Sequence, residues 1–149
     1  MRGHRQGTRQ RGAAALEFAL VAPVLILMIL GMIDFGMIMN AQALVANAAR
    51  DAARVASLNG TEANARSTAL RSASSLGGTA PTVTVQCFID IAATTACTGS
   101  SYDTAKATGN IVRVTVTYTY NWITPLPSWV GMGSTSTISK MAYMRIESS

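Results

Sequence analysis

The sequence predicts an α+β fold: a long N-terminal transmembrane and stalk helix, a second shorter helix, and a head built on a small three-stranded antiparallel sheet. Three observations predict it. Residues 18–33 carry no charge, helical spacing of apolar residues continues to about residue 58, and three later segments alternate apolar and polar residues. A chain of 149 residues is long enough for one small domain with an anchor.

The first element is a membrane-spanning segment over residues 13–33. A helix of that length measures about 31 Å, which matches a hydrocarbon core of about 30 Å. Residues 1–12 form a basic leader that is expected to be cytoplasmic, because arginines beside an apolar helix stay inside, so the chain after Ile33 is expected outside. Pro23 removes one backbone hydrogen bond and predicts a kink, although membrane helices also tolerate a proline without special use.

The net charge of +5 does not indicate a nucleic-acid-binding protein. Four of the twelve basic residues belong to the leader: Arg2, Arg5, Arg9 and Arg11. Without the leader, the chain contains eight basic and seven acidic residues, so its net charge is +1. Such a balance forms no electrostatic footprint for a polyanion, so no nucleic-acid partner is expected.

Residues 34–58 are expected to extend the same helix as an amphipathic stalk. Apolar positions follow steps of three and four, a narrow seam of the coiled-coil kind formed by Ile38, Ala41, Val45, Ala48, Ala52 and Val55. Small seam residues permit close packing, either against another helix or, more commonly, against the protein's own sheet. The first convincing break is Asn59-Gly60.

The extracytoplasmic head is expected over residues 61–149. Thr61 can cap a second helix that runs to Leu76, where Gly77-Gly78 supplies the stop. Its apolar stripe consists of Ala65, Ala69, Ala73 and Leu76. Because the segment is rich in Ala and Ser, a partly ordered linker is the alternative.

Three strands are predicted from a period of two. The first starts at Thr82 and places on one face Val83, Val85, Cys87, Ile89 and Ile91. The second, residues 111–122, places on one face Val112, Val114, Val116, Tyr118, Tyr120 and Trp122. The third, residues 134–147, places on one face Ile138, Ala142, Met144 and Ile146. These faces are expected to pack on the outer half of the long helix, although the aromatic residues, with Trp129, offer an adhesive patch as the less common alternative.

Cys87 and Cys97 lie ten positions apart, and an even count in an oxidising compartment favours one disulfide. A ring of this size contributes on the order of 2 to 3 kcal/mol in the loop-entropy model. Free buried thiols are the alternative. A metal site is not expected, since there is no second thiol pair and no His nearby, and no motif indicates a cofactor.

The sequence does not predict an enzyme. His4, the only histidine, lies in the leader, so no Cys-His or Ser-His-Asp arrangement can be assembled. The scattered acids show no pairing that acid/base catalysis would need.

Glu17 is a candidate functional residue, because placing a carboxylate inside a membrane segment costs roughly 2.5 to 3.5 kcal/mol of insertion free energy. The ordinary interpretation is an acid near a helix end, solvated by headgroups. The alternative is an assembly device. A cut after Gly12 would place a new amine on Ala13, about 6 Å along the axis from Glu17. Pairing of that amine with a neighbour's Glu17 would fix the axial register of two subunits.

These residues resemble the class III signal of type IV pilins: a basic leader, Gly12 before the cut, Glu17 as the fifth residue after it, then an apolar run. The more specific resemblance is to the TadE-like family of minor pilins and pseudopilins of the tight-adherence (Tad, or Flp) pilus. It rests on RGAAALEFALVAPVLILMILGMIDFG and on NAARDAARVAS at residues 47–57. The stretch of residues 37–40 departs from the family, where an Arg or an aromatic is expected.

The resemblance implies that a prepilin peptidase cuts between Gly12 and Ala13 at the inner membrane. Glu17 then carries over as the recognition and assembly acid. The implied partners are other pilin or pseudopilin subunits and the Tad assembly machinery, and the implied role is assembly or initiation of an adhesive pilus.

Two alternatives remain open. An ordinary signal peptide with Ala41-Gln42-Ala43 as its cleavage site would release a secreted β-rich module. An uncut single-pass membrane protein would bind a partner through its head. The mature N-terminus separates the three cases, because it would be Ala13, Leu44 or Met1.

Overall fold

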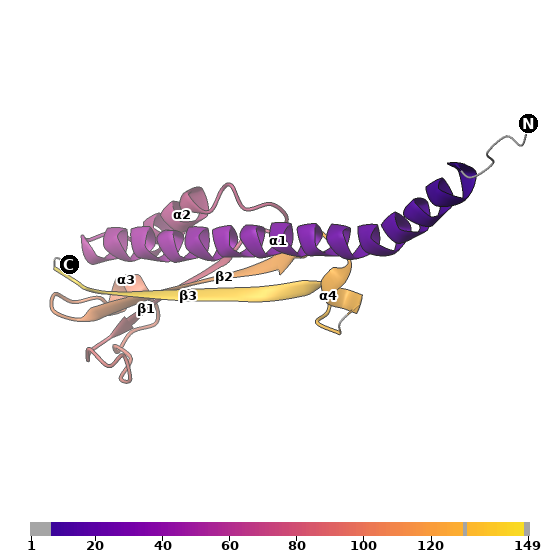
Figure 1. Cartoon of the computed structure of the whole chain (residues 1–149). Helices are drawn as coiled ribbons and strands as arrows, with labels where there is room; N and C mark the ends of the chain where they lie inside the picture. Colours follow the sequence, from indigo (N-terminus) through magenta and orange to yellow (C-terminus); the bar gives the residue numbers. More distant parts are fainter. Residues whose placement is uncertain (1–6, 130, 148–149) are drawn as a thin grey trace, which may run out of the picture.

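The computed structural model describes residues 7–129 and 131–147, so the leader residues 1–6 lie outside the described part. One long helix, α1 (Gly7–Ser57), runs along a three-stranded antiparallel sheet, and a shorter helix, α2 (Glu62–Ser72), lies beside it (Figure 1). The predicted α+β architecture, with its long helix, shorter helix and small sheet, is confirmed.

Helix α1 contains 51 residues and has two structurally different halves. Its C-terminal half lies on the sheet, whereas its N-terminal part extends beyond the sheet and bends away (Figure 1). Pro23 lies inside the helix. The bend and the proline agree with the expected kink, but the assignment of the bend to Pro23 stays a prediction. The helix begins at Gly7, so it includes the end of the predicted leader.

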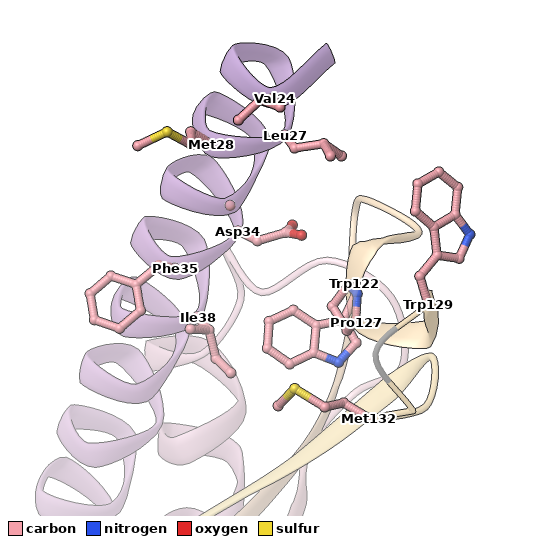
Figure 2. A pocket seen from close by; sticks show the side chains of 11 residues that line it. Val24, Leu27, Met28, Asp34, Phe35, Ile38, Trp122, Pro127, Trp129 and Met132 are labelled. Atoms are coloured by element: carbon pink, nitrogen blue, oxygen red, sulfur yellow. The ribbon is translucent and has the colours of Figure 1, made fainter. Parts of the chain in front are cut away.

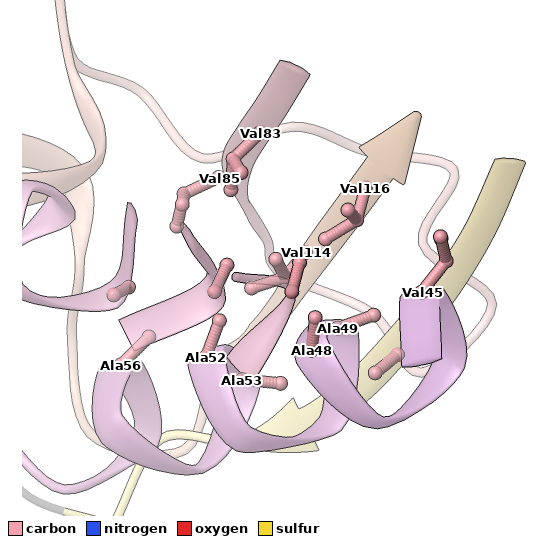
Figure 3. Packing of buried hydrophobic residues seen from close by; sticks show 14 of the residues in the cluster. Val45, Ala48, Ala49, Ala52, Ala53, Ala56, Val83, Val85, Val114 and Val116 are labelled. Atoms are coloured by element: carbon pink, nitrogen blue, oxygen red, sulfur yellow. The ribbon is translucent and has the colours of Figure 1, made fainter. Parts of the chain in front are cut away.

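The stalk half of α1 carries a stripe of small residues that is buried in the head (Figure 3). The predicted seam is buried at its centre, and the structure adds three further alanines, Ala49, Ala53 and Ala56, that are also fully buried. The stripe is wider than the seam because α1 contacts two partners, the sheet and α2. The expectation that the seam packs on the protein's own sheet is therefore confirmed, and α2 widens the contact.

The sheet is built from β1 (Thr82–Phe88), β2 (Ile111–Asn121) and β3 (Thr135–Arg145), in the order β1-β2-β3. Both pairs are antiparallel, and their register aligns Val85 with Val114 and Val114 with Ala142. Alternate residues of each strand face α1, as the period of two predicts, and form a core with the α1 stripe (Figure 3).

The first strand is shorter than predicted. Ile89 and Ile91, expected on its buried face, are 55% and 88% exposed, because the strand ends at Phe88 and the chain turns. The turn is held by Asp90, whose Oδ1 accepts the Thr94 backbone N–H at 2.8 Å. The hydrogen bonds from the Thr94 side chain and backbone lower the pKa of Asp90. The turn that the Asp90 carboxylate stabilises thus ends the strand, although the alternation of apolar residues continues to Ile91.

Helix α2 forms as a helix rather than a linker, and it ends at Ser72, before the expected stop. Thr61 caps it, since its Oγ1 accepts the Asn64 N–H at 3.2 Å. The predicted stripe is buried at its three alanines, and Leu76 is partly buried beyond the helix end. The turn that joins α1 to α2 needs glycine, because a Cβ on Gly60 would overlap the Val55 carbonyl.

Two short helices complete the head. Helix α3 (Tyr102–Ala105) is fixed to the stalk by Tyr102, whose buried hydroxyl donates to the Ala56 carbonyl at 2.7 Å. Helix α4 (Leu126–Trp129) follows β2 and lies at the end of the sheet where the free part of α1 begins (Figure 1). It therefore sits at the junction of head and anchor.

Candidate functional site

The N-terminal half of α1 is an uncovered apolar surface. Its most apolar 18-residue window has a mean hydropathy of 2.5 and is not buried at all, and α1 is the one described helix long and apolar enough to cross a membrane. Side chains such as Phe18, 72% exposed, have no protein neighbour to cover them. A continuous apolar surface of this size needs lipid or a partner, and its length and composition suggest single-pass membrane anchoring.

The predicted cleavage junction lies on this uncovered helix. Gly12, Ala13 and Glu17 are helical and exposed, and nothing comes within 4 Å of the position that a Gly12 Cβ would take. Within the described residues, Glu17 has no ion-pair partner. The three residues are therefore open to an enzyme or to a second subunit.

A second acid, Asp34, lies where α1 leaves the apolar segment. It is only 4% exposed, and the Thr124 hydroxyl donates a hydrogen bond to its Oδ2. Its other oxygen, Oδ1, is buried without a partner in the described part of the chain, as are the Tyr120 hydroxyl and Trp122 Nε1. Burial, followed by the charge of Asp34, raises the pKa of Tyr120, so its hydroxyl keeps its proton.

Asp34 belongs to the GMIDFG exit of the apolar helix, which stands out in the family resemblance, but no role was predicted for its carboxylate. It is the first charged residue after the apolar run, and this position was the sequence feature that could have marked it as a functional residue. Its partner Thr124 lies 90 positions later. No periodicity predicts a contact over that separation, because it depends on how far β2 extends along α1.

The aromatic residues divide between core and surface. Tyr118 and Tyr120 are buried and Trp122 is partly buried, so the predicted strand face is core. Trp129 is 72% exposed and lies on α4. The four residues do not form one exposed patch.

The two cysteines meet at the end of β1. Their Cα atoms are 5.3 Å apart and their sulfur atoms lie at bonding distance, a placement that suits a disulfide. The Cys97 backbone N–H donates to the Cys87 carbonyl at 3.0 Å, so the loop between them closes as a hairpin. Formation of the bond in the cell stays a prediction. The described residues contain no group of three or more His, Cys, Asp or Glu placed to hold a metal ion.

Comparison with known proteins finds a family match for part of the chain. The family model described as TadE-like protein matches residues 12–54, which include the spanning segment and most of the stalk. No curated protein and no solved structure matches the chain. This pilus-related family is not an enzyme family. Residues 12–54 are thus similar to the TadE-like family, which is the family that the N-terminal motif resembles.

Proposed function

We propose that the protein is a minor pilin or pseudopilin of a Tad-type pilus, processed by a prepilin peptidase and acting in pilus assembly or initiation and in surface adhesion. The observation that carries the proposal is the TadE-like helix itself. Its apolar half is uncovered, and Gly12 and Glu17 stand at its start with the spacing of a pilin signal.

Processing is proposed between Gly12 and Ala13, at the cytoplasmic face of the inner membrane. The basic leader favours that orientation. A peptidase must unwind the bond that it cuts, and Gly12 lies inside α1. Glycine disfavours a helix by about 1 kcal/mol relative to alanine, so it weakens the helix at the proposed cut.

Assembly is proposed to depend on the new amine. After the cut, the amine of Ala13 and the carboxylate of Glu17 lie about 6 Å apart along the helix axis. Because Glu17 is exposed and unpaired within the described residues, it is free to receive the amine of a neighbouring subunit. The attraction of the two charges grows as the dielectric constant falls, so lipid or a helix bundle strengthens the pair.

The packing of the head supports a cut at the leader rather than after Ala43. Ala41 is 3% exposed in the core that α1 forms with the head, and Asp34 is bound to Thr124. A cut after Ala43 would remove both contacts from the folded module. A cut after Gly12 leaves every contact between α1 and the sheet in place.

The test compares Glu17→Ala with Glu147→Ala, the same substitution at an exposed acid of the head. Each variant replaces the wild-type protein in cells that make the pilus, and three quantities are measured: protein in the membrane, protein in sheared pili, and the number of pili. We expect Glu17→Ala to insert normally and to lose pilus incorporation or pilus number, while Glu147→Ala matches the wild type. Normal incorporation and pilus number of Glu17→Ala would contradict the proposal.

A further inference from the structure

An open groove of about 610 Å³ lies between α1 and the loop that carries α4, which we call the α4 loop and define as residues 123–133 (Figure 2). Figure 2 shows Leu27 of α1 and Trp129 of the α4 loop on opposite sides of the groove, which Val24 and Met132 also line. Asp34 belongs to the lining as well, but it is only 4% exposed. The surface that the groove presents is therefore apolar.

The α4 loop lies beside the apolar segment of α1 rather than beyond its end. Val24 and Leu27 precede Ile33, the expected end of the membrane span, by about 14 and 9 Å at 1.5 Å per residue. Because the loop lines the same groove as these two residues, it lies at the level of the part of the span that is nearest the head. A bilayer that α1 crosses therefore also meets the α4 loop.

Two hydrogen bonds hold the α4 loop in this place. The buried Thr124 hydroxyl donates to the Asp34 carboxylate of α1. The Trp122 backbone N–H donates to the Ser134 carbonyl at 3.2 Å and closes the base of the loop. Movement of the loop away from α1 would break the bond between Thr124 and Asp34 and leave both groups without it in a buried site, which is costly. The loop and the span are thus presented to lipid together.

The composition of the α4 loop suits contact with lipid. Residues 114–139 contain no charged side chain. Within the loop, Ile123, Trp129 and Met132 are 59%, 72% and 65% exposed. A tryptophan is typical of the layer where headgroups meet acyl chains, and large apolar side chains that stay exposed together mark an interaction surface.

The backbone of the α4 loop is also suited to this layer. The Trp129 N–H donates to the Pro125 carbonyl at 3.2 Å, and the Met132 N–H donates to the Pro127 carbonyl at 2.8 Å. The two prolines have no N–H that would need a partner. Hydrogen bonds made within the loop reduce the cost of moving its backbone out of water.

We propose that the α4 loop is a second membrane contact, which inserts Trp129 and Met132 at the boundary between headgroups and acyl chains of the leaflet nearest the head. Acyl chains fill the groove between the loop and α1. They are the occupant because the α1 wall of the groove continues the uncovered apolar face of the span, so the lipid that covers one also covers the other. The contact uses no charge and needs no particular headgroup.

This second contact would hold the head at one height and one orientation on the membrane, which a single helix does not do. The proposal rests on α1 spanning the membrane and is independent of the role in a pilus.

The test measures the depth of Trp129 in a bilayer, with the full chain in phosphatidylcholine vesicles. The chain has two tryptophans, so Trp122→Phe leaves Trp129 as the sole one. Two sets of vesicles carry bromine on the acyl chains, either near the headgroup end or near the methyl end. Bromine quenches tryptophan fluorescence on contact, so the two sets report shallow and deep positions.

The matched control combines Ile91→Trp with Trp122→Phe and Trp129→Phe, which puts the sole tryptophan at an apolar position of the head that is 88% exposed. Ile91 follows the end of β1 that pairs with Ile111 at the start of β2, whereas the α4 loop follows the end of β2. The control position therefore lies at the opposite end of the sheet, roughly 33 Å from the α4 loop.

We expect the shallow bromines to quench Trp129 more than the deep bromines do, and its emission to shift to shorter wavelength when the chain enters vesicles. The Ile91→Trp control should show neither effect. High salt should leave the quenching of Trp129 unchanged, because the α4 loop carries no charge.

Quenching of Trp129 that is no greater than that of the control would overturn the proposal, as would quenching that high salt removes. A short-wavelength emission that neither set of bromines quenches would also overturn it, because a second copy or another protein segment would then cover the loop. If Trp122→Phe does not fold, the difference in quenching between the wild type and Trp129→Phe gives the same measurement, since Trp129 is exposed and its replacement leaves the core intact.

Discussion

The attachment of the head to the long helix depends on alanines, and Ala52→Leu tests that dependence. Ala52 is fully buried in the stripe of α1 that packs on the head. Leucine adds three carbon atoms at a position where the neighbouring side chains leave no exposed surface. The substitution should therefore separate α1 from the elements that it contacts.

The magnitude follows from two opposed effects. Three further carbons would contribute about 0.8 kcal/mol each if the core had room for them. In a packed core, the strain of extra atoms outweighs this gain, and the net cost is about 1 to 3 kcal/mol. At about 4 °C per kcal/mol for a domain of this size, the Tm should fall by about 4 to 12 °C.

The assay is thermal unfolding of the full chain in detergent, followed by near-ultraviolet circular dichroism, which reports the buried tyrosines of β2. Ala43→Leu is the matched control, because Ala43 is exposed on the same helix and its change should stay within about 0.5 kcal/mol. If Ala52→Leu has the Tm of Ala43→Leu or a higher one, close packing through small residues does not hold the head to α1.

Two further predictions concern the head. Replacement of Cys87 and Cys97 by serine should lower the free energy of unfolding in urea by about 2 to 3 kcal/mol, because the disulfide is lost. If the untreated wild-type protein already reacts with two equivalents of a thiol reagent, its cysteines are free and no such loss should occur. Burial, followed by the charge of Asp103, raises the pKa of Tyr102 to about 12, so the stability that it contributes is complete below pH 10 and is lost as the pH rises from 10 to 12. Tyr102→Phe should flatten the loss of stability between pH 10 and 12. It should also lower stability at neutral pH, because the hydrogen bond to Ala56 is lost. If the urea midpoint of Tyr102→Phe falls with pH as steeply as that of the wild type, Tyr102 is not the group responsible.

The regular elements were predictable because one physical pattern dominates each of them. A charge-free run defined the anchor, steps of three and four defined the stalk, and a period of two defined the buried strand faces. The width of the stalk stripe was not predictable in the same way. Alanine carries little hydrophobic signal, so the burial of Ala49, Ala53 and Ala56 was not predictable from the pattern; α1 contacts α2 as well as the sheet.

The features that escaped prediction depend on local side-chain bonds or on distant contacts. The end of β1 is set by the turn at Asp90, which overrides the apolar character of Ile91. The polar junction of head and anchor depends on Asp34 meeting Thr124 across most of the chain. The candidate cleavage site, in contrast, is a short linear motif, and Gly12 and Glu17 could be found without any knowledge of the fold.

The mature N-terminus is the measurement that tests the central claim most directly. The protein is purified from membranes of cells that make the pilus and is sequenced from its N-terminus. Cleavage by a prepilin peptidase predicts Ala13 as the first residue, and cells without that peptidase should keep the leader. An N-terminus at Leu44 would indicate an ordinary signal peptide, and an intact Met1 in cells with an active peptidase would indicate an uncut anchor. Either result would contradict the assignment of the chain as a processed pilin-like subunit.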